Sequence, residues 1–430
     1  MNLIIFALIS ASCNGQLELV LKLNKYFDSL DGHFMGSVLV MQDGKNLYKR
    51  SMGFADVDNK IPATFQTQYR IGSISKTFTS LLVLKASAEG RLSLDDPIAK
   101  YFPDAAIPNS HLITVDHLLQ HRSGLVDIVN EMEADYFTYN TLPQTREQML
   151  GRIASAGVNF SPGSEYRYCN CGYHLLTYVL EDVYGKSYAE LIDEQIVMPL
   201  GLQHTGYSVT IDPENGDARS YEYVGKWIAS PQTDPSTVLG AGAIASNPGD
   251  LAKFATALSD GFFGRKVAER MTEMKDGHGR GLHVYPIGNG HAGSIDGFYS
   301  LLVISDDMLI AFCSNGMDRS IDIVNDILDI SSGKDVEWPE FDIGPDCDEA
   351  EIYAGTYFID ALGVESDLVA NDGKLYIESM GQYFPLEMTS VATFENRLNG
   401  LKVIVDASDS SLLIVIGDQE LTARKCPRSI

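Results

Sequence analysis

The stretch from Ser73 to Glu89 constrains the fold more than any other part of the chain, because it has the length of a helix and no polar face. Apolar side chains lie on nearly every side of it, and Gly90 ends it. A helix without a polar face is stable only when other elements surround it. The sequence therefore predicts a core large enough to enclose this helix.

Length and composition agree with that expectation. The chain has 430 residues, of which 45% are apolar and 21% charged, as in ordinary globular proteins. This excludes a disordered chain, a collagen-like fibre and a coiled coil, and no run approaches the roughly 20 apolar residues of a membrane-spanning helix. The net charge of −26 with no basic run predicts a soluble acidic protein that does not bind nucleic acid.

Two pairs of apolar runs predict β-hairpins near the two ends of the first 330 residues. One pair flanks Asp43-Gly44 and the other flanks Asp306-Asp307, and such turn residues between apolar runs are typical of hairpins. Helical patterns lie between them, at 112–119, 173–183 and 187–198, and a closing helix is expected at 320–330. This order predicts an α+β domain, an antiparallel sheet flanked by helices, in which the N- and C-terminal strands share the sheet.

The last part of the chain has a different pattern. Residues 331–349 are acidic and interrupted by Pro and Gly, which is typical of a linker. From Ile352 onward, turn residues such as Asn371-Asp372-Gly373 separate six short alternating runs: GTYF, DLVA, KLYIES, QYFPLEM, LKVIVD and SLLIVIG. This pattern predicts a small all-β barrel or sandwich of about 80 residues. We therefore expect a leader at 1–18, a first domain at 19–332, a linker at 333–349 and a β-barrel domain at 350–430.

The N-terminus resembles an export signal. Residues 1–12 form an apolar run that ends in small residues before Cys13, although no Lys or Arg precedes it. We expect a secreted or periplasmic protein, with lipid attachment at Cys13 and an ordinary N-terminal helix as the alternatives left open.

The other cysteines do not predict a metal site. No Cys-x-x-Cys pair or matching His set is present, so we expect neither a metal nor a cofactor. Cys347 and Cys426 bracket the final domain, and in an oxidising compartment they would form a disulfide; two unrelated buried thiols are the equal alternative.

The first candidate for chemistry stands at the start of the buried helix. Ser73 and Lys76 are three residues apart and so share a helix face, and a buried lysine that loses its proton is a suitable base for a serine nucleophile. A second Ser-x-x-Lys match, Ser331 to Lys334, lies in what reads as an exposed linker and is set aside.

Two further motifs follow in order. Tyr168-Cys169-Asn170 supplies a phenol for proton transfer and a carboxamide for a substrate amide; a buried tyrosine beside a helix-capping asparagine is the alternative. His291-Ala292-Gly293 lies in glycine-rich sequence that permits close approach of a ligand to an edge strand. His204 also fits His-x-Gly, but it follows a helix in a turn and is interpreted as a loop residue.

Taken together, the three motifs resemble those of the serine beta-lactamase and penicillin-binding-protein superfamily, in its branch of class C beta-lactamases, D-alanyl-D-alanine carboxypeptidases, D-aminopeptidases and esterases. The resemblance covers about residues 20–330, and the tail is similar to the lipocalin-like domain that some members carry. Connecting segments are also similar to this family: Thr67–Pro103, Ile113–Leu125, Pro162–Leu176 and Pro199–Ser208.

The resemblance implies a role for each motif residue. Ser73 would be the acylated nucleophile, and Lys76 and Tyr168 would move its proton, although which of the two is the base is left open. Asn170, His291, Gly293 and Ser294 would bind the substrate. The backbone N–H groups of Ser73 and Ser294 would form the oxyanion hole.

Two departures from the family pattern refine the expected function. Class C beta-lactamases carry Lys-Thr-Gly where this chain has His291-Ala292-Gly293, and histidine there is similar to certain D,D-carboxypeptidases and D-aminopeptidases. Cys169 replaces the usual serine and is interpreted as an inert thiol. We therefore expect a serine hydrolase that cleaves amides or esters, as small molecules or peptides, with a D-amino-acid-like acyl group. A beta-lactamase proper and a catalytically silent scaffold or binding protein are the alternatives.

Overall fold

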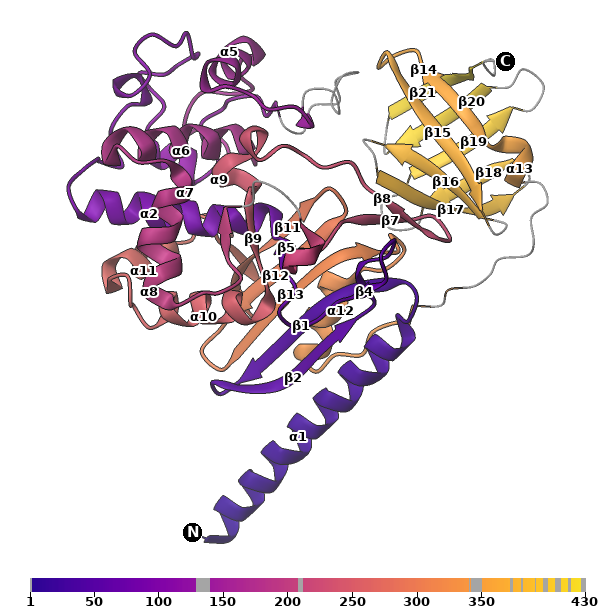
Figure 1. Ribbon diagram of the computed structural model, residues 1–430, viewed down its shortest axis with the longest axis horizontal. Coiled ribbons are helices and arrows are strands. Elements are labelled where there is room, and N and C mark those ends of the chain that lie inside the picture. The colour runs from indigo at the N-terminus through magenta and orange to yellow at the C-terminus, as the bar shows by residue number, and fades with distance from the viewer. Residues whose placement is uncertain are drawn as a thin grey trace.

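The computed structural model describes residues 2–128, 140–207, 212–339, 341, 350–371, 374–379, 382–390, 392–396, 401–406, 411–416 and 419–426, with only the backbone described for 2–14, 379, 382 and 390. A mixed region of helices and sheets is followed by a closed barrel (Figure 1). No helix in these ranges combines the length and the apolar character that a membrane span requires.

The central sheet joins the two ends of the mixed region, as predicted. Its strand order is β10-β11-β12-β13-β1-β2 and its neighbours are antiparallel. The bounds are β10 His283–Tyr285, β11 Gly288–Ile295, β12 Phe298–Ile304, β13 Met308–Met317, β1 Phe34–Gln42 and β2 Lys45–Met52. Both predicted hairpins are confirmed, and Asp43 and Gly44 take φ values of 49° and 73°, which suit a tight turn.

Helices cover both faces of this sheet. In order, the helices of the mixed region are α1 Asn2–Ser29, α2 Ser75–Ala88, α3 Val115–Leu119, α5 Arg146–Ala156, α6 Asn170–Tyr184, α7 Tyr188–Ile192, α8 Met198–Leu200, α9 Leu239–Gly242, α10 Pro248–Ser259, α11 Arg265–Met271 and α12 Ile323–Ser331. A further helix, α13 Ala350–Tyr353, packs on the barrel. Short strands complete the mixed region: β3 Phe54–Asp56, β4 Ile61–Pro62, β5 Tyr69–Arg70, β6 Gly206–Tyr207, β7 Tyr221–Tyr223, β8 Trp227–Ala229 and β9 Ile244–Ser246.

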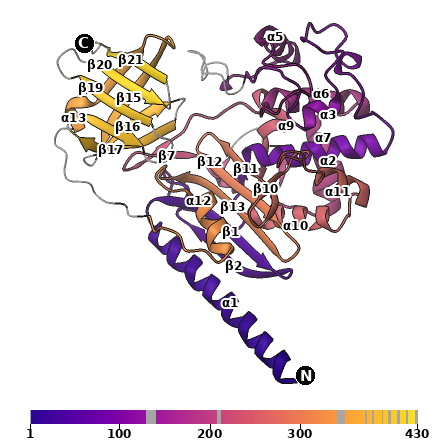
Figure 2. The same cartoon turned by 180° about the vertical axis from the view of Figure 1, so that it is seen from behind.

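Successive side chains of β1 point to opposite faces of the sheet and belong to two different hydrophobic cores. Val38 and Val40 belong to the cluster that α1 and α12 cover, whereas Leu39 belongs to the larger cluster that contains α2 and α6. Figures 1 and 2 show α1 and α12 on one side of the sheet and the larger group of helices on the other. The predicted buried helix is confirmed as α2, which lies inside the larger cluster with most of its side chains buried.

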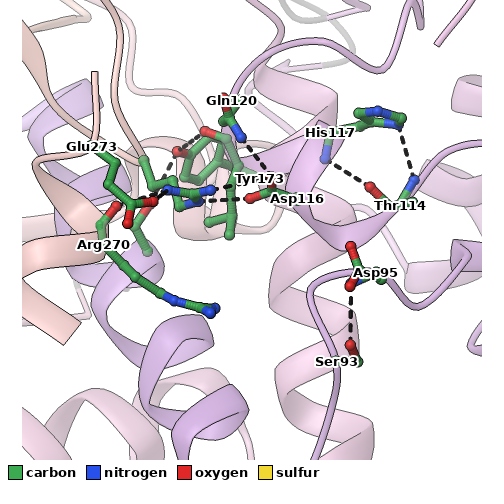
Figure 3. Close-up of polar contacts among 12 residues, drawn as sticks. Ser93, Asp95, Thr114, Asp116, His117, Gln120, Tyr173, Arg270 and Glu273 are labelled. Carbon is green, nitrogen blue, oxygen red and sulfur yellow. Dashed lines mark hydrogen bonds and ion pairs between the residues drawn. The ribbon is translucent and has the colours of Figure 1, made fainter. Parts of the chain in front are cut away.

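Several predicted helix boundaries are wrong. The helix expected at 112–119 begins only at Val115, because the Thr114 side chain caps it by accepting a hydrogen bond from the His117 N–H, and Figure 3 shows this pair. The helix expected at 173–183 already begins at Asn170. The predicted capping box of Ser187 is confirmed, but the helix there changes to a π-helical turn at 193–197 before α8. The closing helix begins at Ile323.

The C-terminal strands form the predicted barrel, with eight strands where the sequence pattern identified six. The strands are β14 Gly355–Ile359, β15 Val364–Asn371, β16 Lys374–Ser379, β17 Gln382–Ser390, β18 Thr393–Asn396, β19 Leu401–Asp406, β20 Ser411–Ile416 and β21 Gln419–Lys425. The unpredicted β18 and β21 are short or polar, and pairing of β21 with β14 closes the barrel. The Cys347–Cys426 disulfide stays a prediction because Cys347 lies outside the described residues, as does most of the turn at 371–373.

The barrel contacts the mixed region at Arg319, which forms a buried ion pair with Glu222 inside the mixed region. Arg319 donates to Glu222 Oε1 at 2.8 Å, and both side chains are at most 9% exposed. The Arg319 guanidinium lies 5.1 Å from the centre of the Phe384 ring in β17 and 4.9 Å from that of Tyr299 in β12. One cation therefore joins the barrel to the central sheet.

The packing of α2 generates a stability prediction. The Phe78 ring stacks on Phe254 with centroids 3.9 Å apart, and both side chains are fully buried. We expect Phe78→Ala to lower the free energy of unfolding by about 3–5 kcal/mol, as measured by urea denaturation followed through the fluorescence of Trp227 and Trp338. Phe262→Ala, at a residue that is 58% exposed, is the control, and equal effects of the two changes would contradict this account of the core.

Candidate active site

The turn that leads into α2 carries the candidate nucleophile. Ser73 lies in a 3-10 turn at Gly72–Ile74, and its Oγ is 3.1 Å from Lys76 Nζ. Gly72 has a φ of +47°, and a Cβ there would lie 2.9 Å from the Ser294 backbone nitrogen. A glycine is therefore needed to bring the backbone of Ser73 against strand β11.

Lys76 is held by three oxygen atoms. Its Nζ donates to Asn170 Oδ1 at 2.7 Å and to the Ala241 carbonyl at 2.8 Å, and the third neighbour is Ser73 Oγ. The carboxamide and carbonyl oxygens can only accept hydrogen bonds, whereas the Ser73 hydroxyl can also donate. A neutral Lys76 amine would therefore give its two N–H groups to these acceptors and direct its lone pair at the Ser73 hydroxyl.

Burial moves the pKa values of the two candidate bases apart. Loss of solvation lowers the pKa of the fully buried Lys76 to about 7, against the opposing attraction of Asp127 and Cys169. Burial raises the pKa of Tyr168 well above its ordinary value, although a hydrogen bond with Ser73 opposes that shift. Near neutral pH, Lys76 can lose its proton while Tyr168 remains a phenol.

His121 holds the Tyr168 segment in place. Its ring stacks on that of Tyr168 with centroids 4.4 Å apart, and its Nδ1 accepts a hydrogen bond from the Cys169 N–H at 3.1 Å. The Lys76 ammonium lies 4.9 Å from the centre of the Tyr168 ring. These contacts fix the Tyr168 ring beside Lys76.

His291 is the first of three linked histidines. Its Nδ1 donates to the Ala292 carbonyl, so its Nε2 accepts from His283 Nε2 at 3.2 Å, and His283 Nδ1 is 2.7 Å from His278 Nδ1. Burial lowers the pKa of His283 to about 4, that of His291 well below its ordinary value, and that of His278 as well. All three rings are neutral at pH 7.

Strand β11 packs tightly against the turn before Ser73. A Cβ on Gly293 would lie 2.1 Å from the Ile71 carbonyl oxygen, so only glycine allows this approach. Within β11, only residues 288–290 pair with β10, and from His291 to Ile295 β11 pairs with β12 alone. The edge that carries Ser294 is thus left facing Ser73, as an oxyanion hole requires.

The predicted residues meet at one cavity of about 640 Å³. Six of them line it: Ser73, Tyr168, Asn170, His291, Gly293 and Ser294. Lys76 is buried directly behind Ser73. Of the described residues that line the cavity, none is a lysine or arginine, and the Asp296 carboxylate on its wall is paired with the buried Arg70 at 2.7 Å. None of the described barrel residues reaches this cavity.

Asn170 has contacts at both ends of its amide. Its Oδ1 accepts from Lys76, and its Nδ2 donates to Asp127 Oδ2 at 2.8 Å. It therefore positions Lys76 as well as lining the cavity where it was predicted to bind a substrate amide.

The second matches to Ser-x-x-Lys and His-x-Gly lie away from the cavity. Ser331 is the last residue of α12, and Lys334 is exposed and paired with Asp329. The backbone N–H of His204 donates to Asp250 in a turn, which agrees with its interpretation as a loop residue. Neither motif lines the cavity.

Sequence reasoning missed several groups of the site: Asp127, His283, Asp296, Arg70 and the Ala241 carbonyl. Asp127 and Ala241 contact the motif residues across 43 and 165 positions of the chain, with no local pattern around them. The only signal was the density of histidines between 278 and 291.

Comparison with known proteins identifies the same family as the three sequence motifs, over the larger part of the chain. A profile of the Beta-lactamase family matches residues 24–331. Protein flp of Staphylococcus aureus is 32% identical over 202 residues, which are 46% of this chain. The match covers only 40% of the length of that relative. The putative penicillin-binding protein PbpX of Bacillus subtilis is 27% identical over 64% of this chain and 68% of its own.

A solved structure is also similar. The D-amino acid amidase from Ochrobactrum anthropi, complexed with D-phenylalanine, superposes with a TM-score of 0.63 at 25% identity. The match covers 74% of this chain and 98% of the amidase.

The lowered pKa of Lys76 predicts a pH dependence. If neutral Lys76 accepts the Ser73 proton, the rate of acylation by a fluorophosphonate probe should rise about tenfold per pH unit below the pKa and level off above it. Because that pKa is about 7, we expect the midpoint near pH 7 when acylation is followed by intact-mass spectrometry. In Lys76→Arg, whose guanidinium keeps its proton, acylation should be lost across the range. A wild-type rate that is independent of pH would contradict the assignment of Lys76 as the base.

Proposed function

Because the chain belongs to the Beta-lactamase family, we propose that it is a serine hydrolase that cleaves amide or ester bonds through an acyl-enzyme. The observation that carries this proposal is the convergence of Ser73, a buried Lys76 and Tyr168 on one cavity. A catalytically silent scaffold is disfavoured, because it would carry the cost of burying Lys76 without using the amine.

The geometry supports a specific order of proton transfers. Neutral Lys76 takes the Ser73 proton as Oγ attacks the substrate carbonyl, and the N–H groups of Ser73 and Ser294 bind the oxyanion. The Tyr168 phenol passes a proton to the leaving amine or alcohol and is reprotonated from Lys76. Water then attacks the acyl-enzyme, gives its proton back through the same groups, and releases the acid and Ser73.

The charge of the cavity supports a choice of substrate. Where class C beta-lactamases have a lysine, this chain has His291, which is neutral at pH 7 and receives a hydrogen bond from a second neutral histidine. A substrate carboxylate would therefore meet no cation among the described residues of the cavity wall. We propose amides or esters of D-amino-acid-like acyl groups without a required carboxylate, as in the D-amino acid amidase, rather than beta-lactams or D,D-dipeptides.

We also propose that the protein is exported, on the basis of the apolar run at 1–12, and that Cys13 is the site where a lipid would be attached. The mass of the N-terminal peptide from protein made in cells tests both statements. A peptide that retains Met1 would contradict export by cleavage.

Two serine variants test the identity of the nucleophile. We expect the protein to hydrolyse D-phenylalanine p-nitroanilide, and Ser73→Ala to lower kcat/KM at least about 1,000-fold because it removes the hydroxyl that Lys76 contacts. Ser331→Ala, in the second Ser-x-x-Lys match, is the matched control and should retain wild-type activity. Equal activity of wild type and Ser73→Ala would refute the proposed site.

Two histidine variants test the proposed substrate class. We expect His291→Lys to increase the rate of acylation by benzylpenicillin at least about tenfold, because it gives the penicillin carboxylate a cation. Hydrolysis of D-phenylalanine p-nitroanilide should not increase. His204→Lys adds the same charge at the other His-x-Gly and is the control. If both variants react with penicillin as slowly as wild type, the charge of residue 291 does not set the substrate class.

A further inference from the structure

A cluster of potential metal ligands lies behind Asn170, on the side away from Lys76. One carboxylate oxygen of Asp127 and the sulfur atoms of Cys169 and Cys171 lie within 4.8 Å of one another. Cys171 Sγ is 3.5 Å from Asp127 Oδ1. Across the ranges that the structure describes, no other group of three such side chains comes this close together.

The two sulfur atoms and the carboxylate oxygen favour particular metal ions. Two thiolates and a carboxylate suit Zn²⁺ and similar thiophilic divalent cations, whereas Mg²⁺ and Ca²⁺ prefer oxygen ligands alone. Three protein ligands leave a fourth tetrahedral position for water. The Cys–Asn–Cys spacing explains why no zinc motif is visible in the sequence, since the third ligand comes from a separate loop.

The surroundings support thiolates at these positions. The Ile128 N–H donates to Cys171 Sγ at 3.3 Å, and both cysteines lie at the N-terminal end of α6, where the helix dipole is positive. Cys169 is 2% exposed and Cys171 is fully buried, so both sulfur atoms would be shielded from solvent around a bound cation.

We propose that Asp127, Cys169 and Cys171 form a binding site for a zinc-like divalent cation, which ties the 121–128 loop to the start of α6. Binding forms two metal–sulfur bonds and one metal–oxygen bond and releases two protons from the thiols. No redox step is involved.

The two oxygens of Asp127 connect this site with the cavity. Oδ1 faces Cys171, whereas Oδ2 accepts the hydrogen bond from Asn170, which in turn binds Lys76. A cation bound through Oδ1 leaves the hydrogen bond from Asn170 intact. It therefore acts as a positioning site for Asn170 and Lys76 and stabilises the folded protein.

The test uses the full chain, reduced and freed of metal with a chelator, and Co²⁺ as the probe. We expect one equivalent of Co²⁺ to bind with a sulfur-to-cobalt charge-transfer band, and Zn²⁺ to displace it and raise the Tm. Cys171→Ser and Cys169→Ser should each weaken binding at least about tenfold and abolish the Tm rise. Cys313→Ser, which removes a buried free thiol in β13, is the matched control and should bind as wild type.

Two further variants separate the alternatives. His283→Ala should retain the charge-transfer band, which excludes the neighbouring histidines as the ligands. Ser73→Ala should bind Co²⁺ as wild type, so the result does not depend on whether the protein is a hydrolase. Wild-type protein that binds no stoichiometric Co²⁺, or binds it without a sulfur band, would overturn the proposal, and so would undiminished binding in both cysteine variants. Because the wild-type measurement is decisive by itself, a variant that fails to fold does not affect the conclusion.

Discussion

The burial of Lys76 is the constraint on which the rest of the site depends. A lysine enclosed by the core loses the solvation of its charge, so its pKa falls to about 7 and the amine becomes a base at neutral pH. That burial is possible only because α2 has no polar face and other helices surround it. Asn170 and Ala241 then supply acceptors that direct the amine toward Ser73.

Loss of solvation also decides the character of the cavity wall. The same loss of solvation that lowers the pKa of Lys76 also lowers the pKa values of His291 and His283, so both rings are neutral at pH 7. One physical effect thus prepares a nucleophile and removes the cation that a carboxylate substrate would need. The described barrel residues do not line the cavity, and Arg319 lies between the barrel residue Phe384 and Tyr299 of the cavity wall.

Much of the fold follows from local pattern. Both hairpins, the buried helix and the barrel were predictable, because alternation and turn residues report burial and chain reversal directly. The starts of α3 and α6 were not, because capping by Thr114 and the contacts of Asn170 shift them. Strand β21 was missed because its sequence is polar, and its place follows from closure of the barrel against β14.

For the site, the sequence by itself determined the three motifs, their order and the residue types, since Ser73 and Lys76 are only three residues apart in the chain. Only the tertiary structure decided which other groups touch them. Asp127, Ala241 and His283 reach the motifs from distant segments, and such contacts leave no periodic signal in the chain. The pKa of Lys76 and the neutrality of His291 likewise belong to the folded protein, because both depend on the exclusion of water by side chains that are brought together only when the core forms.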